Sequence, residues 1–187
     1  MTADITAEKA ALRRQLRQQR HAITPEQHDQ AGQTLMRIIQ QRWPHDHLAA
    51  YVNAGSEVPT MSLLAARWRE GVGVWLPQVT GSTLRWCHVR DRQQLHRGYR
   101  GILEPDPACC PRQDSPEGAK VMLVPGLGFS HSGARLGQGG GFYDRILPAA
   151  RARGVYCLGV AFACQLRAEL PTEAHDAVLD EVLVCDG

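Results

Sequence analysis

Residues 121–147 read VMLVPGLGFSHSGARLGQGGGFYDRIL, and the interpretation of the whole chain depends on them. The four apolar residues 121–124 predict a buried strand that ends at Pro125. Seven of the 16 residues from 126 to 141 are glycine. Glycine is required where the backbone takes a positive φ, or where a Cβ would collide with a neighbouring group. A buried strand that leads into such a loop is typical of the ligand-binding edge of an α/β sheet.

The charged residues of this loop indicate an anion site. Arg135 lies among the glycines, and Asp144 follows where a helix is predicted to begin. The N–H groups of a helix N-terminus bind phosphate together with an arginine, and an aspartate beside the phosphates can hold Mg²⁺. The loop has neither the Lys-Ser/Thr ending of a P-loop nor the last glycine of the dinucleotide-binding pattern. The alternative interpretation is a glycine-rich surface turn.

The composition favours a single globular domain, residues 1–187. Hydrophobic residues make up 43% of the chain and charged residues 21%. The six cysteines lack zinc-finger spacing, so we expect reduced thiols in a cytoplasmic protein. There is no apolar run of transmembrane length and no secretory signal, and we therefore expect no membrane partner.

Sequence patterns predict alternating helices and strands. The first half of the chain is expected to contain a basic helix within residues 1–20, a second helix at 25–42 with a capping box at Thr24 and Gln27, a strand at 48–52 and a helix at 57–69. A hairpin of strands at 72–77 and 84–89 should follow, and then an irregular proline-rich segment at 90–120. After the strand at 121–124, we expect a helix at 143–153 and strands at 155–162 and 177–184. This order predicts an α/β fold, a three-layer α/β/α sandwich around a mostly parallel sheet, with a basic N-terminal helix.

Two residues of the N-terminal helix are candidates for phosphate binding. Lys9 and Arg13 lie four residues apart, so both side chains leave the same helix face and could hold a triphosphate. From the residues alone, a solvated basic face is the better interpretation. Nucleic-acid binding has little support, because the basic residues lie on one short helix and no RNP or finger pattern occurs.

Glu57 has two interpretations. It follows the strand predicted at 48–52, a position from which a carboxylate can accept hydrogen bonds from the paired N–H donors of a pterin. It can equally be an acid in the first turn of the helix predicted at 57–69, where it offsets the macrodipole. The residues do not separate the two.

Other candidates are aromatic or acidic. Flat faces for a pterin ring are available at Tyr51, Trp75, Trp86 and Tyr143, although Trp75 and Trp86 could instead pair across the predicted hairpin. Acids near the predicted strands are Asp144, Asp176 and Asp180, and two carboxylates that converge on phosphates would carry Mg²⁺. His175 is a candidate general acid or a structural histidine.

The chain resembles the 5-formyltetrahydrofolate cyclo-ligase family, also called 5,10-methenyltetrahydrofolate synthetase. The resemblance is carried by Pro125-Gly126-Leu127-Gly128-Phe129, Gly133 and the block Arg135-Leu136-Gly137-Gln138-Gly139-Gly140-Gly141-Phe142-Tyr143-Asp144-Arg145. Less specific matches follow in order along the chain at Lys9-x-x-x-Arg13 and at residues 57–60, 76–77, 159–162 and 175–182.

This resemblance implies a role for named residues. ATP would contact Lys9, Arg13, Arg135, Leu136, Gly137, Gln138, Gly139, Gly140, Gly141, Phe142 and Tyr143. The folate would contact Val52, Glu57, Gln138, Gly139, Gly140, Gly141 and Phe142. Arg135 and Lys9 would be catalytic, and Asp144 with Asp176 would hold Mg²⁺.

The implied reaction is ATP- and Mg²⁺-dependent cyclisation of 5-formyltetrahydrofolate to 5,10-methenyltetrahydrofolate, with release of ADP and phosphate, through a phosphorylated formyl group. Positioning and charge stabilisation are the protein's main tasks in such a reaction. The expected partners are ATP and the folate, without nucleic acid or membrane, and the expected state is a monomer.

Three positions depart from the family pattern, and two other functions stay open. Ser130 stands where an aspartate is usual, Gly140 where some members carry lysine, and Phe142 where tyrosine is frequent. One alternative is a non-catalytic regulator that binds nucleotide or folate on the same fold. The other is a sugar-phosphate isomerase, for which His131 is the only local candidate base.

Overall fold

The computed structural model describes residues 2–98, 101–173 and 176–186. Its helices are α1 (Thr2–His21), α2 (Pro25–Arg42), α3 (Met61–Arg69) and α4 (Phe142–Ala152). Its central sheet contains β1 (Leu48–Ala49), β2 (Val74–Thr80), β3 (Thr83–Val89), β6 (Val121–Val124), β9 (Tyr156–Ala161) and β11 (Glu181–Val184). Two small sheets contain β7 (Gly128–Ser130), β8 (Arg135–Leu136) and β10 (Leu166–Arg167), and β4 (Leu95–Arg97) with β5 (Leu103–Pro105).

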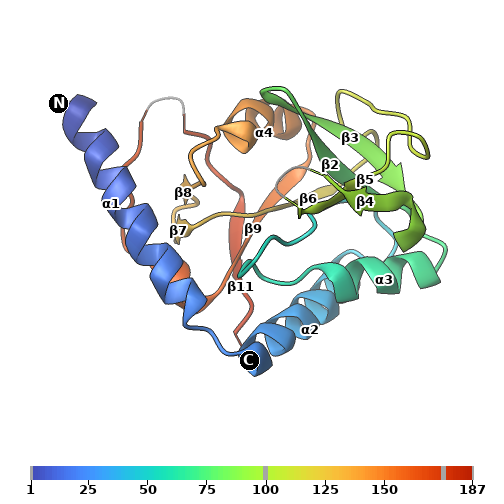
Figure 1. The fold of residues 1–187 in the computed structure, drawn as a ribbon, viewed down its shortest axis with the longest axis horizontal. Coiled ribbons are helices and arrows are strands. Elements are labelled where there is room, and N and C mark those ends of the chain that lie inside the picture. The colour runs from blue at the N-terminus through green and yellow to red at the C-terminus, as the bar shows by residue number, and fades with distance from the viewer. Residues whose placement is uncertain (1, 99–100, 174–175, 187) are drawn as a thin grey trace.

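The central sheet confirms the predicted fold class. Its strand order is β11-β9-β6-β1-β2-β3, and every neighbouring pair is parallel except the β2–β3 hairpin. Helices α2 and α3 cover one face of the sheet and α4 covers the other (Figure 1). Each face has its own apolar cluster, one built around Leu35, Leu64 and Leu123, the other around Phe129 and Leu147. The arrangement is a three-layer α/β/α sandwich.

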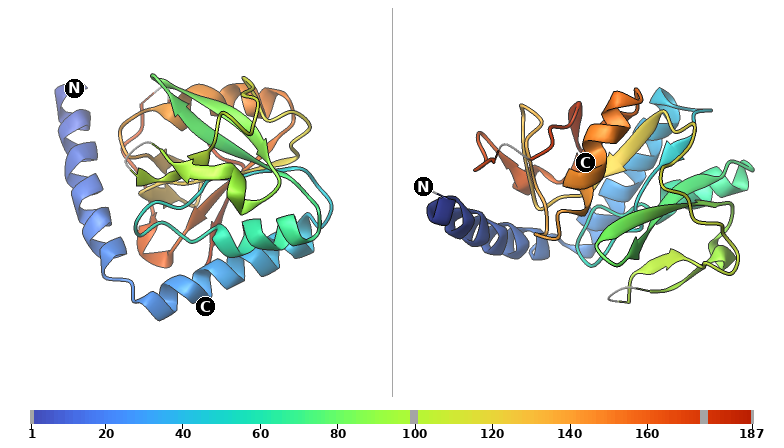
Figure 2. Two further views of the ribbon diagram at one scale, coloured as in Figure 1. Left: turned by 45° about the vertical axis from the view of Figure 1, so that its right-hand side comes forward. Right: turned by 90° about the horizontal axis from the view of Figure 1, so that it is seen from above.

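Helix α1 lies beside the sandwich instead of in one of its layers (Figures 1 and 2). Its apolar anchor is Leu16, which is fully buried in a small cluster with Leu127 and Leu136. Two of its basic residues, Lys9 and Arg20, are also buried. The basic face of this helix therefore meets protein, which contradicts the interpretation of a solvated basic face for Lys9.

The N-terminus of α2 has the predicted cap. The Thr24 hydroxyl accepts a hydrogen bond from the Gln27 N–H at 3.3 Å, and the Gln27 side chain accepts one from the Thr24 N–H at 3.0 Å. Pro25 occupies the first turn, where a missing N–H costs nothing. The helix buries Ala31, Leu35 and Ile39, whereas Ile38 is half-buried.

The helix predicted at 57–69 begins later, at Met61. The preceding residues form a turn in which the Glu57 N–H donates to the Ala54 carbonyl oxygen, and the Glu57 carboxylate accepts from the Ala54 N–H at 2.9 Å. Pro59 also disfavours helical φ and ψ at the residue before it. The interpretation of Glu57 as an acid of the first helical turn is therefore wrong.

Other element boundaries also differ from expectation. The segment 90–120 is not wholly irregular, because β4 and β5 pair in it as an antiparallel hairpin. The strand predicted at 48–52 is paired only at Leu48–Ala49, and the strand predicted at 177–184 begins at Glu181. These elements are too short to produce a periodic pattern.

The structure also describes the state of the cysteines and the apolar character of the helices. All six cysteines are free, and four of them are buried. In the described part of the chain, no helix combines the length and apolar character that crossing a membrane requires.

Candidate active site

Two cavities share a wall made of the glycine loop. The large cavity, about 980 Å³, lies among the segments that follow β1 and β6, the β2–β3 hairpin and the β4–β5 hairpin. The small cavity, about 210 Å³, lies between the glycine loop, α1 and the segment that contains Glu173 and Asp176. Both are lined by Arg135, Gly137, Gly139 and Gly141. The loop after the buried strand β6 is thus placed between two spaces.

Every residue to which the family resemblance assigns a role lines one or both cavities. The small cavity alone is lined by Lys9, Arg13, Leu136, Asp144 and Asp176. The large cavity alone is lined by Val52, Glu57, Gln138, Gly140, Phe142 and Tyr143. The shared wall is formed by Arg135, Gly137, Gly139 and Gly141. The fold brings these residues together from distant parts of the sequence. The individual roles stay predictions.

Glycine is required at two positions of the wall, one for a steric reason and one because of its backbone conformation. A Cβ at Gly137 would lie 2.8 Å from Nη1 of Arg135, so only glycine lets the guanidinium lie against the loop. Gly141 is the N-cap residue of α4, with φ of 63°, and it provides no side-chain cap. The first N–H groups of α4 therefore have no capping side chain at an edge shared by both cavities.

Arg135 is the central charged residue of the shared wall. Its side chain is 3% exposed and forms an ion pair with Asp144, with Nη2 and Oδ1 2.7 Å apart. Nη1 donates to the Pro125 carbonyl oxygen at 3.1 Å, and the guanidinium lies over the Tyr143 ring, 5.6 Å from its centroid. Nε is buried without a hydrogen-bond partner among the described residues. A buried donor without a partner is costly, and here it remains available for a ligand oxygen.

Lys9 and Arg13 reach the small cavity from α1. The Lys9 ammonium donates to Glu173 at 2.7 Å and to Asp176 at 2.6 Å. Burial lowers the pKa of Lys9, but the hydrogen bonds to Asp176 and Glu173 outweigh it, and the net shift is upwards. Arg13 donates from Nε to the Gly137 carbonyl oxygen at 3.0 Å. Lys9 is therefore charged at neutral pH, and both cations contact the walls of the small cavity.

The carboxylates of the small cavity fit a metal ion that enters with a nucleotide. Asp144 and Asp176 both line this cavity, and each forms an ion pair, with Arg135 and Lys9 respectively. The described residues contain no group of three or more His, Cys, Asp or Glu side chains that could hold a metal ion. Mg²⁺ commonly takes one or two carboxylates and completes its coordination with phosphate oxygens and water. Two carboxylates beside a phosphate-sized space meet that requirement.

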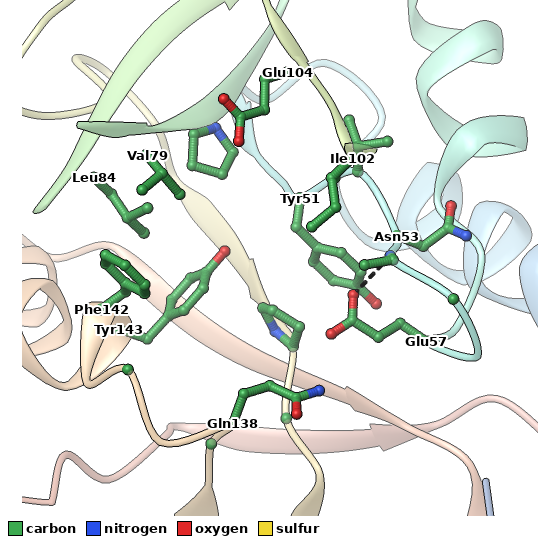
Figure 3. A pocket seen from close by; sticks show the side chains of 18 of the residues that line it. Tyr51, Asn53, Glu57, Val79, Leu84, Ile102, Glu104, Gln138, Phe142 and Tyr143 are labelled. Atoms are coloured by element: carbon green, nitrogen blue, oxygen red, sulfur yellow. Dashed lines mark hydrogen bonds between the residues drawn. The ribbon is translucent and has the colours of Figure 1, made fainter. Parts of the chain in front are cut away.

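The large cavity is mainly apolar, with an acid at one side. Figure 3 shows Glu57 opposite Phe142 and Tyr143, with Gln138 from the glycine loop below them. Burial raises the pKa of Glu57, and the hydrogen bond from the Ala54 N–H opposes that shift. Burial also raises the pKa of Tyr143, so this phenol is neutral at physiological pH. The cavity thus combines aromatic faces with a desolvated hydrogen-bond acceptor.

Two of the proposed ring-binding aromatic residues lie elsewhere. Trp75 and Trp86 are buried in the core cluster on the α4 side of the sheet and line neither cavity. They are not directly opposite each other in the hairpin, since Trp75 pairs with His88 and Trp86 with Pro77. Tyr51 and Tyr143 do line the large cavity. Residue type alone does not tell whether an aromatic side chain is buried in the hairpin or lines a cavity.

Other candidates are explained by local structure. Asp180 forms an ion pair with Arg151 and accepts the Cys157 N–H, and it lines neither cavity. The Ser130 hydroxyl is 2.8 Å from that of Ser132 and accepts the Ala134 N–H at 3.1 Å, so it stabilises a turn outside both cavities. His131 is exposed and lines neither cavity, which removes the structural support for an isomerase base. His175 lies outside the described residues.

Sequence reasoning missed residues that support the glycine loop from behind or close the large cavity. The Gly126 carbonyl oxygen accepts hydrogen bonds from Arg20 at 3.1 Å and from Gln165 at 2.8 Å. The β4–β5 hairpin adds Arg97, Ile102, Leu103 and Glu104 to the wall of the large cavity. Spacing in the sequence gives no signal for these contacts, because they connect segments that are distant along the chain.

Comparison with known proteins agrees with this geometry. The profile of the 5-formyltetrahydrofolate cyclo-ligase family matches residues 5–185. The chain belongs to this family of ligases. Family relatives include a 5-formyltetrahydrofolate cyclo-ligase of Haemophilus influenzae, 29% identical over 96% of this chain and 98% of the relative, and one of Escherichia coli K12, 31% identical over 90% and 95%.

Solved structures of the family share the fold. The 5,10-methenyltetrahydrofolate synthetase of Aquifex aeolicus superposes with a TM-score of 0.80 at 28% identity, covering 94% of this chain and 89% of that one. The synthetase of Mycoplasma pneumoniae superposes with a TM-score of 0.69 at 21% identity, covering 94% and 97%. The α/β sandwich is therefore the family's fold.

Proposed function

We propose that this protein catalyses the ATP- and Mg²⁺-dependent cyclisation of 5-formyltetrahydrofolate to 5,10-methenyltetrahydrofolate, with release of ADP and phosphate. The observation that carries the proposal is the shared wall: Arg135 and the glycine loop line a small charged cavity on one side and a large apolar cavity on the other. A reaction that transfers a phosphoryl group from a nucleotide to a ring substrate needs two such spaces that meet at one point. Family membership supports the same activity.

The small cavity supports the nucleotide end of this proposal. Lys9, Arg13 and Arg135 supply three cations, and the α4 N-terminus supplies N–H groups beside them. Such groups stabilise the charge of a transferring phosphoryl group without rearranging during the reaction. Asp144 and Asp176 would hold Mg²⁺, which supplies charge neutralisation on the phosphate oxygens. The terminal phosphates of ATP therefore belong on the side of the wall that faces α1.

The large cavity supports the folate end. Glu57 is a half-buried acceptor suited to the paired N–H groups of a pterin, and Tyr51, Phe142 and Tyr143 offer aromatic surface. With the pterin at Glu57, the formyl group lies toward Gln138 and the glycine loop. The unpaired Nε of Arg135 is then available to an oxygen of the transferred group.

The chemistry proceeds in two displacements. The formyl oxygen attacks the terminal phosphorus of ATP and ADP leaves, which converts a poor leaving group into a phosphate ester. N10 then attacks the formyl carbon, N10 loses its proton, and the C–O bond breaks to release phosphate with the former formyl oxygen. Arg135 and Lys9 stabilise the phosphoryl charge in the first step, and the large cavity holds N10 near the carbon in the second.

The direct test is turnover by the purified protein. Incubation with 5-formyltetrahydrofolate and Mg-ATP should produce the methenyl absorbance and one ADP for each product formed. Omission of either ATP or Mg²⁺ should abolish both signals. A regulator that binds nucleotide or folate without chemistry would bind both ligands and produce neither signal, and that result would exclude the proposal. The monomeric state and cytoplasmic location stay predictions.

A further inference from the structure

Charged side chains line the large cavity from several segments of the chain. The described residues that line it include four with charged side chains: Glu57, Arg97, Glu104 and Arg135. Arg135 is on the glycine-loop side and is already paired with Asp144. Arg97 belongs to the β4–β5 hairpin, whose residues Ile102 and Glu104 lie across the cavity from Gln138 (Figure 3). The hairpin therefore contributes a buried acid, Glu104, and an exposed cation, Arg97, to the lining of the cavity.

The guanidinium of Arg97 has spare hydrogen-bonding capacity. Arg97 is exposed, and the described residues give its side chain one hydrogen bond, from Nη1 to the Gly101 carbonyl oxygen at 3.1 Å. An arginine has five N–H donors in a fixed fork that matches a carboxylate. The bond to Gly101 ties the guanidinium to the turn of its own hairpin and leaves most of its donors unused by the described residues.

The proposed function orients its substrate in this cavity. The proposed function places the pterin at Glu57 and the formyl group at the glycine loop, where it meets the phosphoryl group. The remainder of the molecule then extends away from the loop, past the apolar side chains of Val79, Leu84 and Ile102, toward the hairpin. A folate presents an aromatic ring and then the carboxylates of its glutamate in that order. The lining of the cavity offers a counterpart for each of these parts: the acceptor Glu57, the apolar side chains and the exposed Arg97.

We propose that Arg97 is a specificity residue that binds the glutamate carboxylates of the folate at the mouth of the large cavity. This inference rests on the proposed function, and it adds the direction in which the substrate lies. It assigns to the β4–β5 hairpin the recognition of the anionic tail, while the pterin is recognised by Glu57. A solvent-exposed ion pair of this kind contributes modestly, about two- to fivefold in affinity.

The test compares folate ligands with and without the tail. The dissociation constant of each is measured by fluorescence titration without ATP, and KM and kcat are measured with Mg-ATP. The ligands are 5-formyltetrahydropteroate, which lacks glutamate, 5-formyltetrahydrofolate and its triglutamate. Arg97→Gln removes the charge and Arg97→Lys retains it. Arg92→Gln is the matched control, because Arg92 is an exposed arginine of the same segment that does not line the cavity.

Arg97→Gln should raise the dissociation constant and KM of the two glutamate-bearing ligands about two- to fivefold, leave the pteroate within experimental error and leave kcat unchanged. Arg97→Lys should retain part of the preference, and Arg92→Gln should retain all of it. In the unmodified protein, the preference for glutamate should shrink as salt rises, because exposed charges are screened.

If Arg97→Gln weakened the binding of all three ligands equally, Arg97 would have a structural role in the hairpin and the inference would be overturned. The inference would also be overturned if the unmodified protein bound pteroate and folate with equal affinity, or if Arg92→Gln had the same effect as Arg97→Gln. Failure of the proposed function is recognised separately, because the unmodified protein would then form no methenyl product from any of these ligands.

Discussion

The two cavities of the candidate active site are built from different kinds of interaction. Six of the ten described residues that line the small cavity are charged, three of each sign, whereas four of the 25 that line the large cavity are charged. The small cavity is formed by residues distant in sequence, as in the pair Lys9 and Asp176, which are 167 positions apart. The large cavity is formed mainly by segments at the edge of the central sheet.

This difference indicates how each cavity contributes to catalysis. Buried ion pairs such as Arg135 with Asp144 add little net stability, because desolvation offsets the attraction. Their value lies in holding opposite charges where phosphates and Mg²⁺ can replace the partners. The large cavity instead provides shape and the carboxylates of Glu57 and Glu104. Substitutions in the small cavity should therefore affect nucleotide use and turnover, and substitutions in the large cavity should affect folate binding.

The largest effect is expected at the wall that separates the cavities. Arg135→Ala should lower kcat on the order of 100-fold or more, because it removes the donor proposed to stabilise the transferred group, while the folate dissociation constant changes little. Steady-state kinetics and fluorescence titration measure the two quantities.

Arg135→Lys controls for the charge that Arg135→Ala leaves unpaired, because it keeps a cation beside Asp144. Full turnover in Arg135→Lys would show that turnover requires the positive charge beside Asp144 and not the guanidinium donors. Equal losses in turnover and folate affinity would contradict the assigned role of Arg135.

Glu57→Gln should separate the large cavity from the small one. Loss of a charged acceptor should raise the folate dissociation constant about tenfold or more, because such hydrogen bonds contribute about 1.5–3 kcal/mol, while KM for ATP stays the same. Glu117→Gln, at an exposed acid that lines neither cavity, is the control. A rise in KM for ATP in place of the folate effect would reverse the assignment of the two cavities.

Lys9→Met should produce the opposite pattern. We expect KM for ATP to rise about tenfold, in the range for loss of a charge-assisted hydrogen bond, with folate affinity unchanged. Thermal stability should also fall, because Glu173 and Asp176 lose their cation. Arg14→Met, at an exposed position of the same helix, controls for a general loss of positive charge. If both variants raise KM for ATP equally, the overall positive charge of α1 contributes more to ATP binding than the contact made by Lys9 itself.

The smallest effect is expected in the pH dependence of folate binding. Burial raises the pKa of Glu57, so this carboxyl takes up a proton at a higher pH than an exposed glutamate does. The protonated form is a poorer acceptor for the pterin, and folate affinity should fall as pH decreases through that raised pKa. Glu57→Gln should flatten this dependence in fluorescence titrations between pH 5 and 8, and an unchanged profile would exclude Glu57 as its source.

Sequence reasoning was most reliable where one segment carried its own signal. The capping box at Thr24 and Gln27 depends on neighbours within a few residues. The start of α3 was wrong because the turn at Ala54 and Glu57 depends on a side-chain hydrogen bond that helix patterns do not include. The β4–β5 hairpin was missed because strands of three residues show no periodicity.

The sequence by itself determined the alternation of elements, the buried strand β6 and the glycine loop after it, because apolar periodicity and glycine content are local properties. Only the tertiary structure decided that Lys9 meets Asp176, that Arg20 and Gln165 hold the Gly126 carbonyl oxygen, and that Arg97 lines the large cavity. Those contacts join segments far apart in the chain, and their distances follow from the packing of α1 and the hairpin against the sheet.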